Sequence, residues 1–155
     1  MEEEKLNDEL QLVVFKLVEE EYGFAINQVE GIIKMVEATR VPKAPRYISG
    51  IINLRGKVIP VINLKERFNL AQSALNDQNR IIVVEIQDYL VGIMVDCVTE
   101  VLRLSDTAVE PTPSVFSSNI SDEYIKGVGK LNERLIILLD LEHILSIEEI
   151  NEYAE

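Results

Sequence analysis

The chain of 155 residues has no Trp, one Cys and one His, and it lacks any long apolar run. One Cys cannot form a disulfide within the chain, which favours a reducing compartment. No apolar stretch approaches the ~20 residues that a membrane-spanning helix needs, so we expect no membrane insertion. The same scarcity of His and Cys, without carboxylates clustered at loop spacing, predicts no metal site.

Positive charge is also scarce: 15 Lys and Arg face 27 Asp and Glu, a formal net charge of -12. This balance repels phosphate backbones and anionic surfaces, so we expect no nucleic-acid partner. The chain begins Met1-Glu2-Glu3-Glu4, whereas a signal peptide begins with basic residues. An apolar fraction of 47% is typical of a folded protein. We therefore expect a folded cytoplasmic protein.

Short apolar runs, rich in β-branched residues and separated by turn residues, predict an all-β fold. The expected strands are 11–18, 22–26, 31–36, 51–54, 57–63, 80–86, 89–95, 98–104, 125–130 and 134–139. Short helices are expected near 45–49, 64–68 and 142–145. Ser146, followed by Glu148 and Glu149, predicts the start of a last helix.

An internal repeat organises these strands. The segment 50–59 (GIINLRGKVI) aligns with 127–136 (GVGKLNERLI) at an offset of 77 (127 minus 50), and 22–32 resembles 89–101 at an offset of 69 (98 minus 29). Each copy supplies about five strands, which can close into a small barrel without exposed edges. The repeat predicts one domain, 1–155, of two pseudo-symmetric five-stranded barrels sharing a core. We expect the first barrel over about 10–75, the second over about 76–141, and a helical segment over 142–155.

Residues that could carry chemistry are few. His143 follows Asp140 in a short predicted helix and is expected to be a surface or capping residue. Cys97 lies in an apolar region without a nearby base, which favours a buried, inert thiol. Segment 127–130 (GVGK) resembles the end of a phosphate loop, but a strand follows it and Leu131 replaces the required Ser or Thr. We therefore expect no catalytic residue, no cofactor and no enzyme; a small-ligand β-barrel or an enzyme is a distant alternative.

A folded β protein without a reactive site is expected to act by presenting surfaces. Arg55 lies between Leu54 and Gly56 at a predicted hairpin turn. Two interpretations stay open: a turn residue pointing into water, or an anchor for a partner's carboxylate. Val29 and Ile32 are likewise either core residues or part of a groove between the barrels that accepts an amphipathic helix.

These residues carry a resemblance to a known family. The segments 22–32 (YGFAINQVEGI) and 50–61 (GIINLRGKVIPV) resemble CheW, the family of bacterial chemotaxis coupling proteins. The segments 91–101 (VGIMVDCVTEV) and 127–141 fit the same family. The resemblance covers roughly 12–145, and the Asn-Leu-Arg-Gly element followed by Pro is its most specific part.

The resemblance implies two SH3-like five-stranded barrels around a shared core. It implies a non-enzymatic adaptor that links the cytoplasmic tips of methyl-accepting chemoreceptors to the regulatory domain of the histidine kinase CheA. Such adaptors lie in receptor arrays beneath the inner membrane and can self-associate in rings. The family also implies partner-binding roles for Arg55, Val29 and Gly50, with Gly56 completing the Asn-Leu-Arg-Gly element.

Two positions depart from the family pattern. Gly31 stands where many members have Glu, so a polar contact there is lost or shifted to Glu30, which we include among the partner-binding candidates. Asn63 replaces the common Asp before Leu64 and can still cap the following turn. A related adaptor serving another chemosensory pathway, such as type IV pili, is the alternative function. CheV is less compatible, since it would need a receiver domain that this length does not hold.

Overall fold

Strands dominate the computed structural model, which describes residues 9–105, 108–110 and 122–153. The strands are β1 (Glu9–Leu17), β2 (Glu20–Ala25), β3 (Val29–Lys34), β4 (Ile48–Leu54), β5 (Lys57–Asn63), β6 (Arg80–Ile86), β7 (Tyr89–Val95), β8 (Cys97–Ser105), β9 (Val109–Glu110), β10 (Ile125–Leu131) and β11 (Arg134–Leu139). The helices are α2 (Leu64–Arg67), α3 (Leu141–Ile144) and α4 (Ile147–Tyr153). Two short 3-10 turns, η1 (Ile26–Gln28) and η3 (Asp122–Tyr124), complete the elements.

The all-β prediction is confirmed, and β6 and β7 have the expected bounds. The two-residue β9 was not among the expected strands. The helix expected over 45–49 is wrong: the Ile48 N–H bonds the Pro45 carbonyl at 3.0 Å in a turn, and Ile48 begins β4 opposite Ile62. Strand pairing there provides more hydrogen bonds than one isolated helical turn.

The strands form two sheets with the orders β8-β1-β2-β11-β10-β9 and β3-β6-β7-β5-β4. In the second sheet, Thr39 follows β3 and exchanges two backbone hydrogen bonds of 2.8 Å with Ile51 of β4, which closes a five-stranded barrel. In the first sheet, β9 follows β8 and pairs with β10, which closes the other barrel. We call them the middle barrel (β3 to β7, 29–95) and the terminal barrel (β1, β2 and β8 to β11, over 9–25, 97–105, 109–110 and 125–139).

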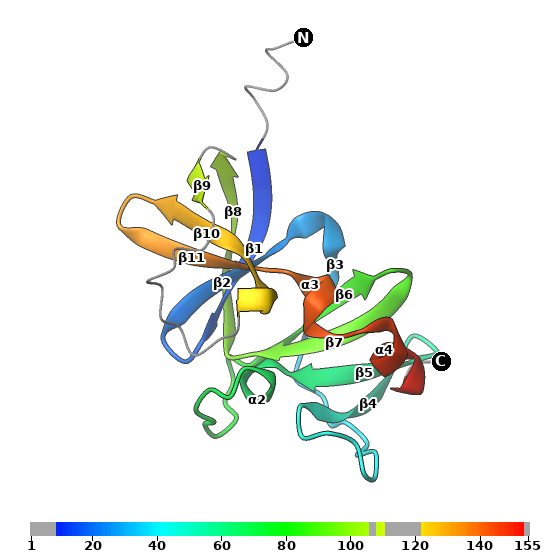
Figure 1. The fold of residues 1–155 in the computed structure, drawn as a ribbon. Coiled ribbons are helices and arrows are strands. Elements are labelled where there is room, and N and C mark those ends of the chain that lie inside the picture. The colour runs from blue at the N-terminus through cyan, green and yellow to red at the C-terminus, as the bar shows by residue number, and fades with distance from the viewer. Residues whose placement is uncertain (1–8, 106–107, 111–121, 154–155) are drawn as a thin grey trace.

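The division of the chain between the barrels differs from the expected boundary near residue 75. The β1–β2 hairpin belongs to the terminal barrel with the later strands, while β6 and β7 belong to the middle barrel. Figure 1 shows blue β1 and β2 beside orange β10 and β11, and green β7 beside β5, which in turn pairs with β4. The two halves of the repeat therefore exchange their first hairpins. A repeat reveals that two hairpins are alike, but not which barrel each one joins.

The repeat itself is confirmed in the strand register. Val61 of β5 pairs with Gly92, and Leu138 of β11 pairs with Gly23, both in parallel ladders. These four residues obey the offsets of 77 (138 minus 61) and 69 (92 minus 23). The β4–β5 and β10–β11 pairs also carry register shifts at equivalent places, before Gly50 and before Gly127. The barrels are related by an approximate two-fold arrangement.

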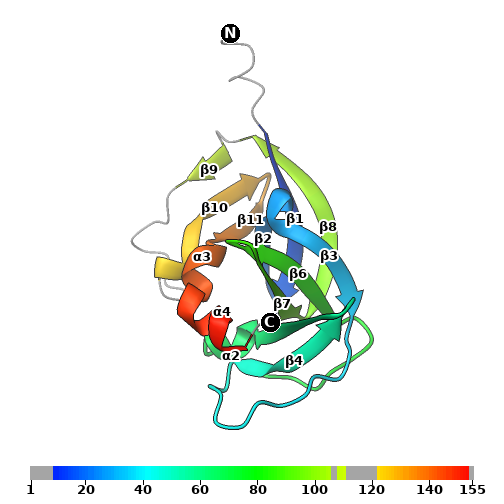
Figure 2. The ribbon, with the colours of Figure 1, turned by 90° about the vertical axis from the view of Figure 1, so that its right-hand side faces the viewer.

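Apolar side chains form three clusters. Each barrel encloses a small one: Ile52, Ile59, Val61, Ile81 and Val83 in the middle barrel, and Leu12, Val14, Leu104, Ile136 and Leu138 in the terminal barrel. The largest cluster combines residues of both barrels with the helices, including Phe15, Phe24, Ile82 and Ile93. Figure 2 shows the two barrels packed directly on one another. The predicted shared core is this third cluster.

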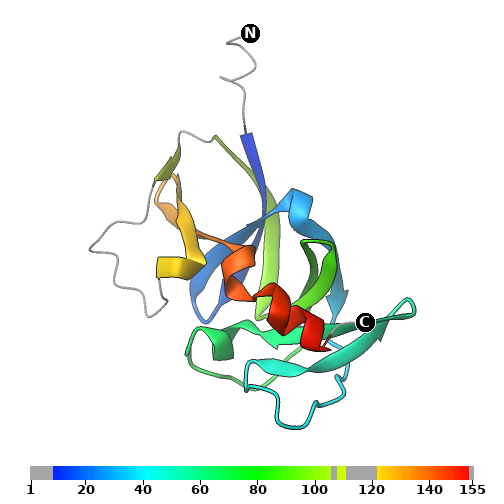
Figure 3. The ribbon, with the colours of Figure 1, turned by 45° about the vertical axis from the view of Figure 1, so that its right-hand side comes forward.

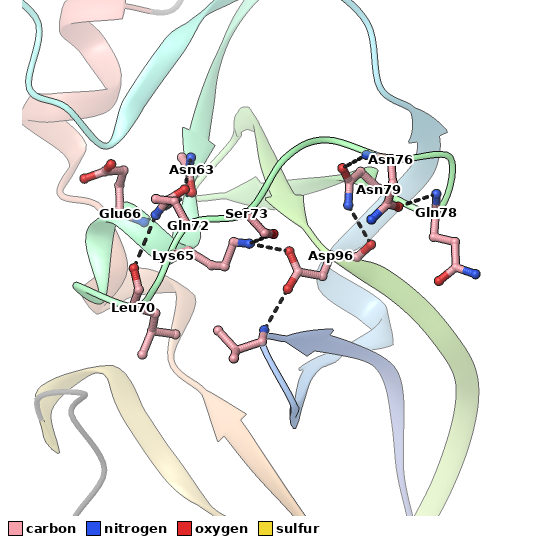
Figure 4. A network of polar contacts seen from close by, with 11 residues as sticks. Asn63, Lys65, Glu66, Leu70, Gln72, Ser73, Asn76, Gln78, Asn79 and Asp96 are labelled. Atoms are coloured by element: carbon pink, nitrogen blue, oxygen red, sulfur yellow. Dashed lines mark hydrogen bonds and ion pairs between the residues drawn. The ribbon is translucent and has the colours of Figure 1, made fainter.

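A polar network fastens the point where the chain passes from β7 to β8 (Figure 4). The Asp96 carboxylate accepts a hydrogen bond from the Val18 N–H at 2.7 Å and pairs with the Lys65 ammonium at 2.8 Å. Lys65 also donates to the Ser73 hydroxyl, and the Asn79 side chain donates to the Asp96 carbonyl. Lys65 is 7% exposed and the Asp96 side chain is 23% exposed, so water partly reaches this pair between the two barrels.

The helices begin at the expected caps. Asn63 accepts from the Glu66 N–H, and the equivalent Asp140 accepts from the Glu142 N–H, both at 3.2 Å. At α4, the Ser146 hydroxyl accepts from the Glu149 N–H at 3.1 Å, while the Ser146 N–H donates to the Glu149 carboxylate at 2.9 Å. This reciprocal pair is a capping box.

The α3–α4 segment crosses from the terminal barrel to the middle barrel (Figure 3). Ile150 of α4 is fully buried in the shared core. The Tyr47 hydroxyl donates to the Glu149 carboxylate, and the Arg67 guanidinium lies 4.2 Å from the centre of the Tyr47 ring. Burial and the bond to Glu149 raise the pKa of Tyr47 to about 12. These contacts hold the last helix against the middle barrel.

Candidate functional site

The β4–β5 hairpin positions Arg55. Leu54 and Lys57 pair at the ends of the strands, which leaves Arg55 and Gly56 as a two-residue loop. Their φ angles are 52° and 85°, as a type I′ turn requires, and Gly56 adopts this conformation readily because it has no Cβ. The Gly56 N–H donates to the Asn53 side chain at 3.0 Å. The turn therefore projects the Arg55 side chain outward, and Arg55 is exposed.

Beside this turn lies a surface hollow of about 230 Å³, which we call the Arg55 hollow. Its lining residues come from all five strands of the middle barrel and the turn: Glu30, Gly31, Ile33, Leu54, Arg55, Lys57, Val83 and Leu90. Ile33, Leu54, Val83 and Leu90 are apolar, whereas the three charged residues are exposed. The hollow thus combines an apolar lining with charged groups that water reaches.

Two cations at the hollow have no partner among the described residues. Neither Arg55 nor Lys57 forms a side-chain hydrogen bond or an ion pair within the described part of the chain, and nor does Glu30. Arg55 and Lys57 are therefore free to pair with an outside carboxylate, and the Arg55 guanidinium can do so through two hydrogen bonds. An apolar surface next to such charges is suited to a protein segment of mixed character.

The structure brings Arg55, Gly56 and Glu30 to one area, but places Val29 and Gly50 differently. Val29 is half-buried and packs against the shared core. Gly50 is buried where the middle barrel closes, and a Cβ there would collide with the Thr39 carbonyl oxygen. Packing explains the residue type at both positions. Val29 and Gly50 could therefore affect partner binding only indirectly, by maintaining the shape of the barrel.

Several residues of the Arg55 hollow were not identified from the sequence. Val83 and Leu90 belong to the β6–β7 hairpin, about thirty residues after the Arg55 turn, and reach the site only because the hairpins are exchanged. The sequence around Lys57 and Ile33 contains no motif that marks either residue as part of a binding site. Ile32, the other open candidate for a groove, is 42% exposed, and its repeat equivalent Val101 is 54% exposed.

No cluster of three or more His, Cys, Asp or Glu suited to a metal occurs among the described residues. His143 is exposed, and its Nδ1 lies 2.7 Å from the Asp140 carboxylate, as expected for a surface residue near a cap. Cys97 is a free thiol that is half-buried rather than buried. It is the first residue of β8, where the chain crosses from the middle barrel to the terminal barrel. Segment 127–130 lies within β10, so it is no phosphate loop. No helix in the described ranges is long and apolar enough to cross a membrane.

Two closed barrels, a shared core and an apolar hollow whose cations are unpaired within the described ranges define an interaction module of the two-barrel class. A family model described as a CheW-like domain matches residues 11–149. The chain belongs to the CheW-like family.

Relatives of known identity agree with this assignment. The chain is 38% identical to a chemotaxis protein CheW of Helicobacter pylori, over 88% of this chain and 81% of that protein. It is 37% identical to a chemotaxis protein CheW of Klebsiella aerogenes, over 90% and 83%. The crystal structure of the scaffolding protein TtCheW from Thermoanaerobacter tengcongensis matches with a TM-score of 0.83 and 38% identity, over 92% of this chain and 91% of that one. None of these names denotes an enzyme, in agreement with a non-enzymatic protein.

Proposed function

We propose that this chain is a chemotaxis adaptor that couples transmembrane chemoreceptors to the histidine kinase CheA. One surface binds the cytoplasmic tip of a receptor, and another binds the regulatory domain of the kinase. The proposal places the protein on the cytoplasmic side of the membrane, within receptor arrays. The proposal includes self-association into rings.

The Arg55 hollow is the observation that carries the proposal. It offers two unpaired cations next to Leu54, Ile33 and Leu90 in a chain whose net charge is strongly negative. A non-enzymatic protein of this family acts through such surfaces. Coupling of receptor to kinase requires only that the adaptor bind two receptor states differently, by about 1 to 3 kcal/mol. Reversible contacts of that size are strengthened by assembly in an array.

Calorimetric titration tests the proposal directly. The full chain is titrated separately with the CheA regulatory domain and with a soluble fragment of the receptor tip, both from the organism of origin. We expect saturable binding to both. If neither partner binds at concentrations up to about 100 μM, a free energy weaker than about -5.5 kcal/mol, the chain serves another chemosensory pathway.

Arg55→Ala separates a binding role from a structural one. Because Arg55 is exposed and unpaired, we expect its removal to leave the melting temperature nearly unchanged while weakening receptor or kinase binding about tenfold. Arg103→Ala is the matched control, since Arg103 is also exposed and lies on β8 of the terminal barrel. Unfolding of Arg55→Ala, or equal losses of binding in both variants, would contradict the assignment of Arg55.

A further inference from the structure

The last helix, α4, breaks the approximate two-fold arrangement of the barrels. At the offset of 77, α2 corresponds to α3, and residues 147–153 of α4 correspond to 70–76. Residues 70–76 form no helix and lead on toward β6. α4 instead crosses from the terminal barrel onto the middle barrel (Figure 3). It is therefore a link between the barrels in addition to the β2–β3 and β7–β8 crossovers.

Arg67 at the end of α2 lies between equivalent tyrosines of the two barrels. Tyr47 precedes β4, Tyr124 precedes β10, and the two correspond at the offset of 77. The Tyr47 carbonyl accepts a hydrogen bond from the Asn63 N–H at 2.7 Å. The Tyr124 carbonyl accepts in the same way from the Asp140 N–H at 2.9 Å. The Arg67 guanidinium carbon lies 4.2 Å from the centre of the Tyr47 ring and 5.6 Å from that of Tyr124, so one cation contacts both barrels.

Glu149 of α4 completes this cluster, which we call the Arg67 joint (Arg67, Tyr47, Tyr124 and Glu149). The Glu149 carboxylate accepts from the Tyr47 hydroxyl and lies 3.7 Å from Arg67 Nη2. The joint is not fully satisfied, because Arg67 Nε is buried and has no hydrogen-bond partner among the described residues. A buried donor without an acceptor costs free energy. The docked position of α4 therefore carries a cost that release of the helix would remove.

Few other contacts hold α4. The helix has seven residues, too few to be stable in isolation. Among its described side chains, Ile150 is fully buried and Tyr153 packs partly buried against the shared core. Glu148 and Glu152 are exposed. Docking and folding of α4 are therefore one event, and Glu149 is its polar anchor.

We propose that α4 is a releasable strap that controls how the two barrels sit on one another. Docked, α4 holds Arg67 against both tyrosines through Glu149 and fixes one arrangement. Released, it frees the guanidinium, lets water accept from Arg67 Nε, and allows the terminal barrel to shift slightly on the middle barrel within the limits of the two crossovers. The chain then has two arrangements, and a partner that binds one of them more tightly selects it.

Hydrogen exchange followed by NMR measures the release of the strap. The Ile150 N–H donates to the Ser146 carbonyl at 3.0 Å, so its exchange reports the opening of α4. We expect this amide to exchange at least about a hundredfold faster than the amides of β6 and β7, which open only with the whole fold. Glu149→Gln keeps the size but removes the charge facing Arg67, and should speed exchange at Ile150 about three- to tenfold without changing β6 and β7. Glu148→Gln, at an exposed position of the same helix, is the matched control and should exchange like the wild type.

Spin-label distances measure the arrangement of the barrels. Labels at Lys34 on β3 and at Glu133 in the β10–β11 turn, both exposed, report on one barrel each once Cys97 is replaced by Ser. Glu149→Arg places two like charges at the joint and should release α4. We expect the distance distribution to broaden or to gain a second population in Glu149→Arg, while Glu148→Arg keeps the single distance of the wild type.

The results distinguish a strap from a helix that merely frays. If Ile150 exchanges as slowly as β6 and β7, or if Glu149→Arg frees α4 but keeps the wild-type distances, the inference is wrong. Should Glu149→Arg unfold the chain, Tyr47→Phe decides by the same two measurements, because it removes only the hydroxyl that donates to Glu149. All measurements use the chain without partners. A failed strap therefore leaves the adaptor function standing, and failed receptor or kinase binding leaves the strap standing.

Discussion

The two barrels share a strand order and an apolar lining, yet they use equivalent surface positions differently. In the terminal barrel, Arg134 is satisfied internally by Glu21 and Glu100. In the middle barrel, the equivalent Lys57 lies at the open Arg55 hollow with Gly31 and Leu90. The equivalent position therefore carries an internally paired cation in the terminal barrel and, among the described residues, an unpaired cation in the middle barrel.

The two segments that cross between the barrels, β7–β8 and β2–β3, also differ in their polar contacts. The β7–β8 crossover is fastened by Asp96 with Lys65, Val18 and Asn79. At the equivalent β2–β3 crossover, the residue at the position of Asp96 is Asn27, which is exposed in the short turn η1. The β7–β8 junction is stabilised by partly buried polar contacts, and the β2–β3 junction by the packing of its neighbours.

The largest expected effect tests whether the barrels fold as one unit. Val61 and Leu138 are equivalent residues, each buried inside its own barrel. Val61→Asp or Leu138→Asp would bury an unpaired charge at a cost above about 4 kcal/mol, so either change should unfold the whole chain. Circular dichroism and a thermal melt measure this. Two separate transitions, with one barrel surviving, would contradict the shared core.

The second largest effect on stability is expected at the β7–β8 crossover, where Lys65 pairs with Asp96. Lys65→Ala leaves the Asp96 carboxylate without its cation at a site that water partly reaches, so we expect a loss of about 2 kcal/mol in the free energy of unfolding. Asn27→Ala at the other crossover is the control and should change stability by less than about 0.5 kcal/mol. Denaturant unfolding compares the two. Equal effects would mean that the crossovers do not differ in strength.

A smaller difference is expected at the equivalent glycines in the parallel ladders. A Cβ at Gly92 would lie 2.8 Å from Ile81 Cγ2, whereas one at Gly23 would lie 3.4 Å from Ile136 Cγ2. Because Ile81 is branched at Cβ and buried, it cannot move away easily. Gly92→Ala should therefore destabilise the chain by about 1 to 3 kcal/mol, and Gly23→Ala by less. Melting temperatures in the reverse order would show that the middle barrel is the looser one.

The smallest expected effect lies at the ion pairs of Arg134 with Glu21 and Glu100. Arg134 is about one-third exposed, and solvent screens its bonds, so Arg134→Ala should cost only about 0.5 to 1 kcal/mol. The loss should shrink at high salt. Lys57→Ala should not change stability measurably, since Lys57 has no partner among the described residues. A larger loss for Lys57→Ala than for Arg134→Ala in thermal melts would reverse the comparison of the two sites.

Local chemistry explains why so much of the fold was predictable. β6 and β7 have the expected bounds, since their apolar residues are continuous and turn residues follow them. Asn63 and Ser146 cap the helices that follow them. The Arg55 turn was also predicted, because a two-residue loop that contains Gly suits a hairpin. Each of these features depends on residues within a few positions of one another.

The candidate site was only partly predictable. Arg55, Glu30 and Gly56 were named from the sequence, and Gly31 was noted as a departure from the family pattern. Leu90 and Val83 were missed because they belong to a hairpin expected in the other barrel. Gly50 was a candidate for binding, yet its burial against Thr39 reflects the closure of the barrel, a contact between segments that no local pattern reveals.

The sequence by itself determined the strands, the turns, the caps and the offsets of the repeat, because alternation and turn chemistry act between near neighbours. Only the tertiary structure decided which hairpin joins which barrel. Both hairpins present the same apolar pattern and could pair with either set of strands. The short links after β2 and β7 carry the chain onward into the other barrel. This exchange places Leu90 beside Gly31 and Lys57, and so the open site arises from pairing between distant segments.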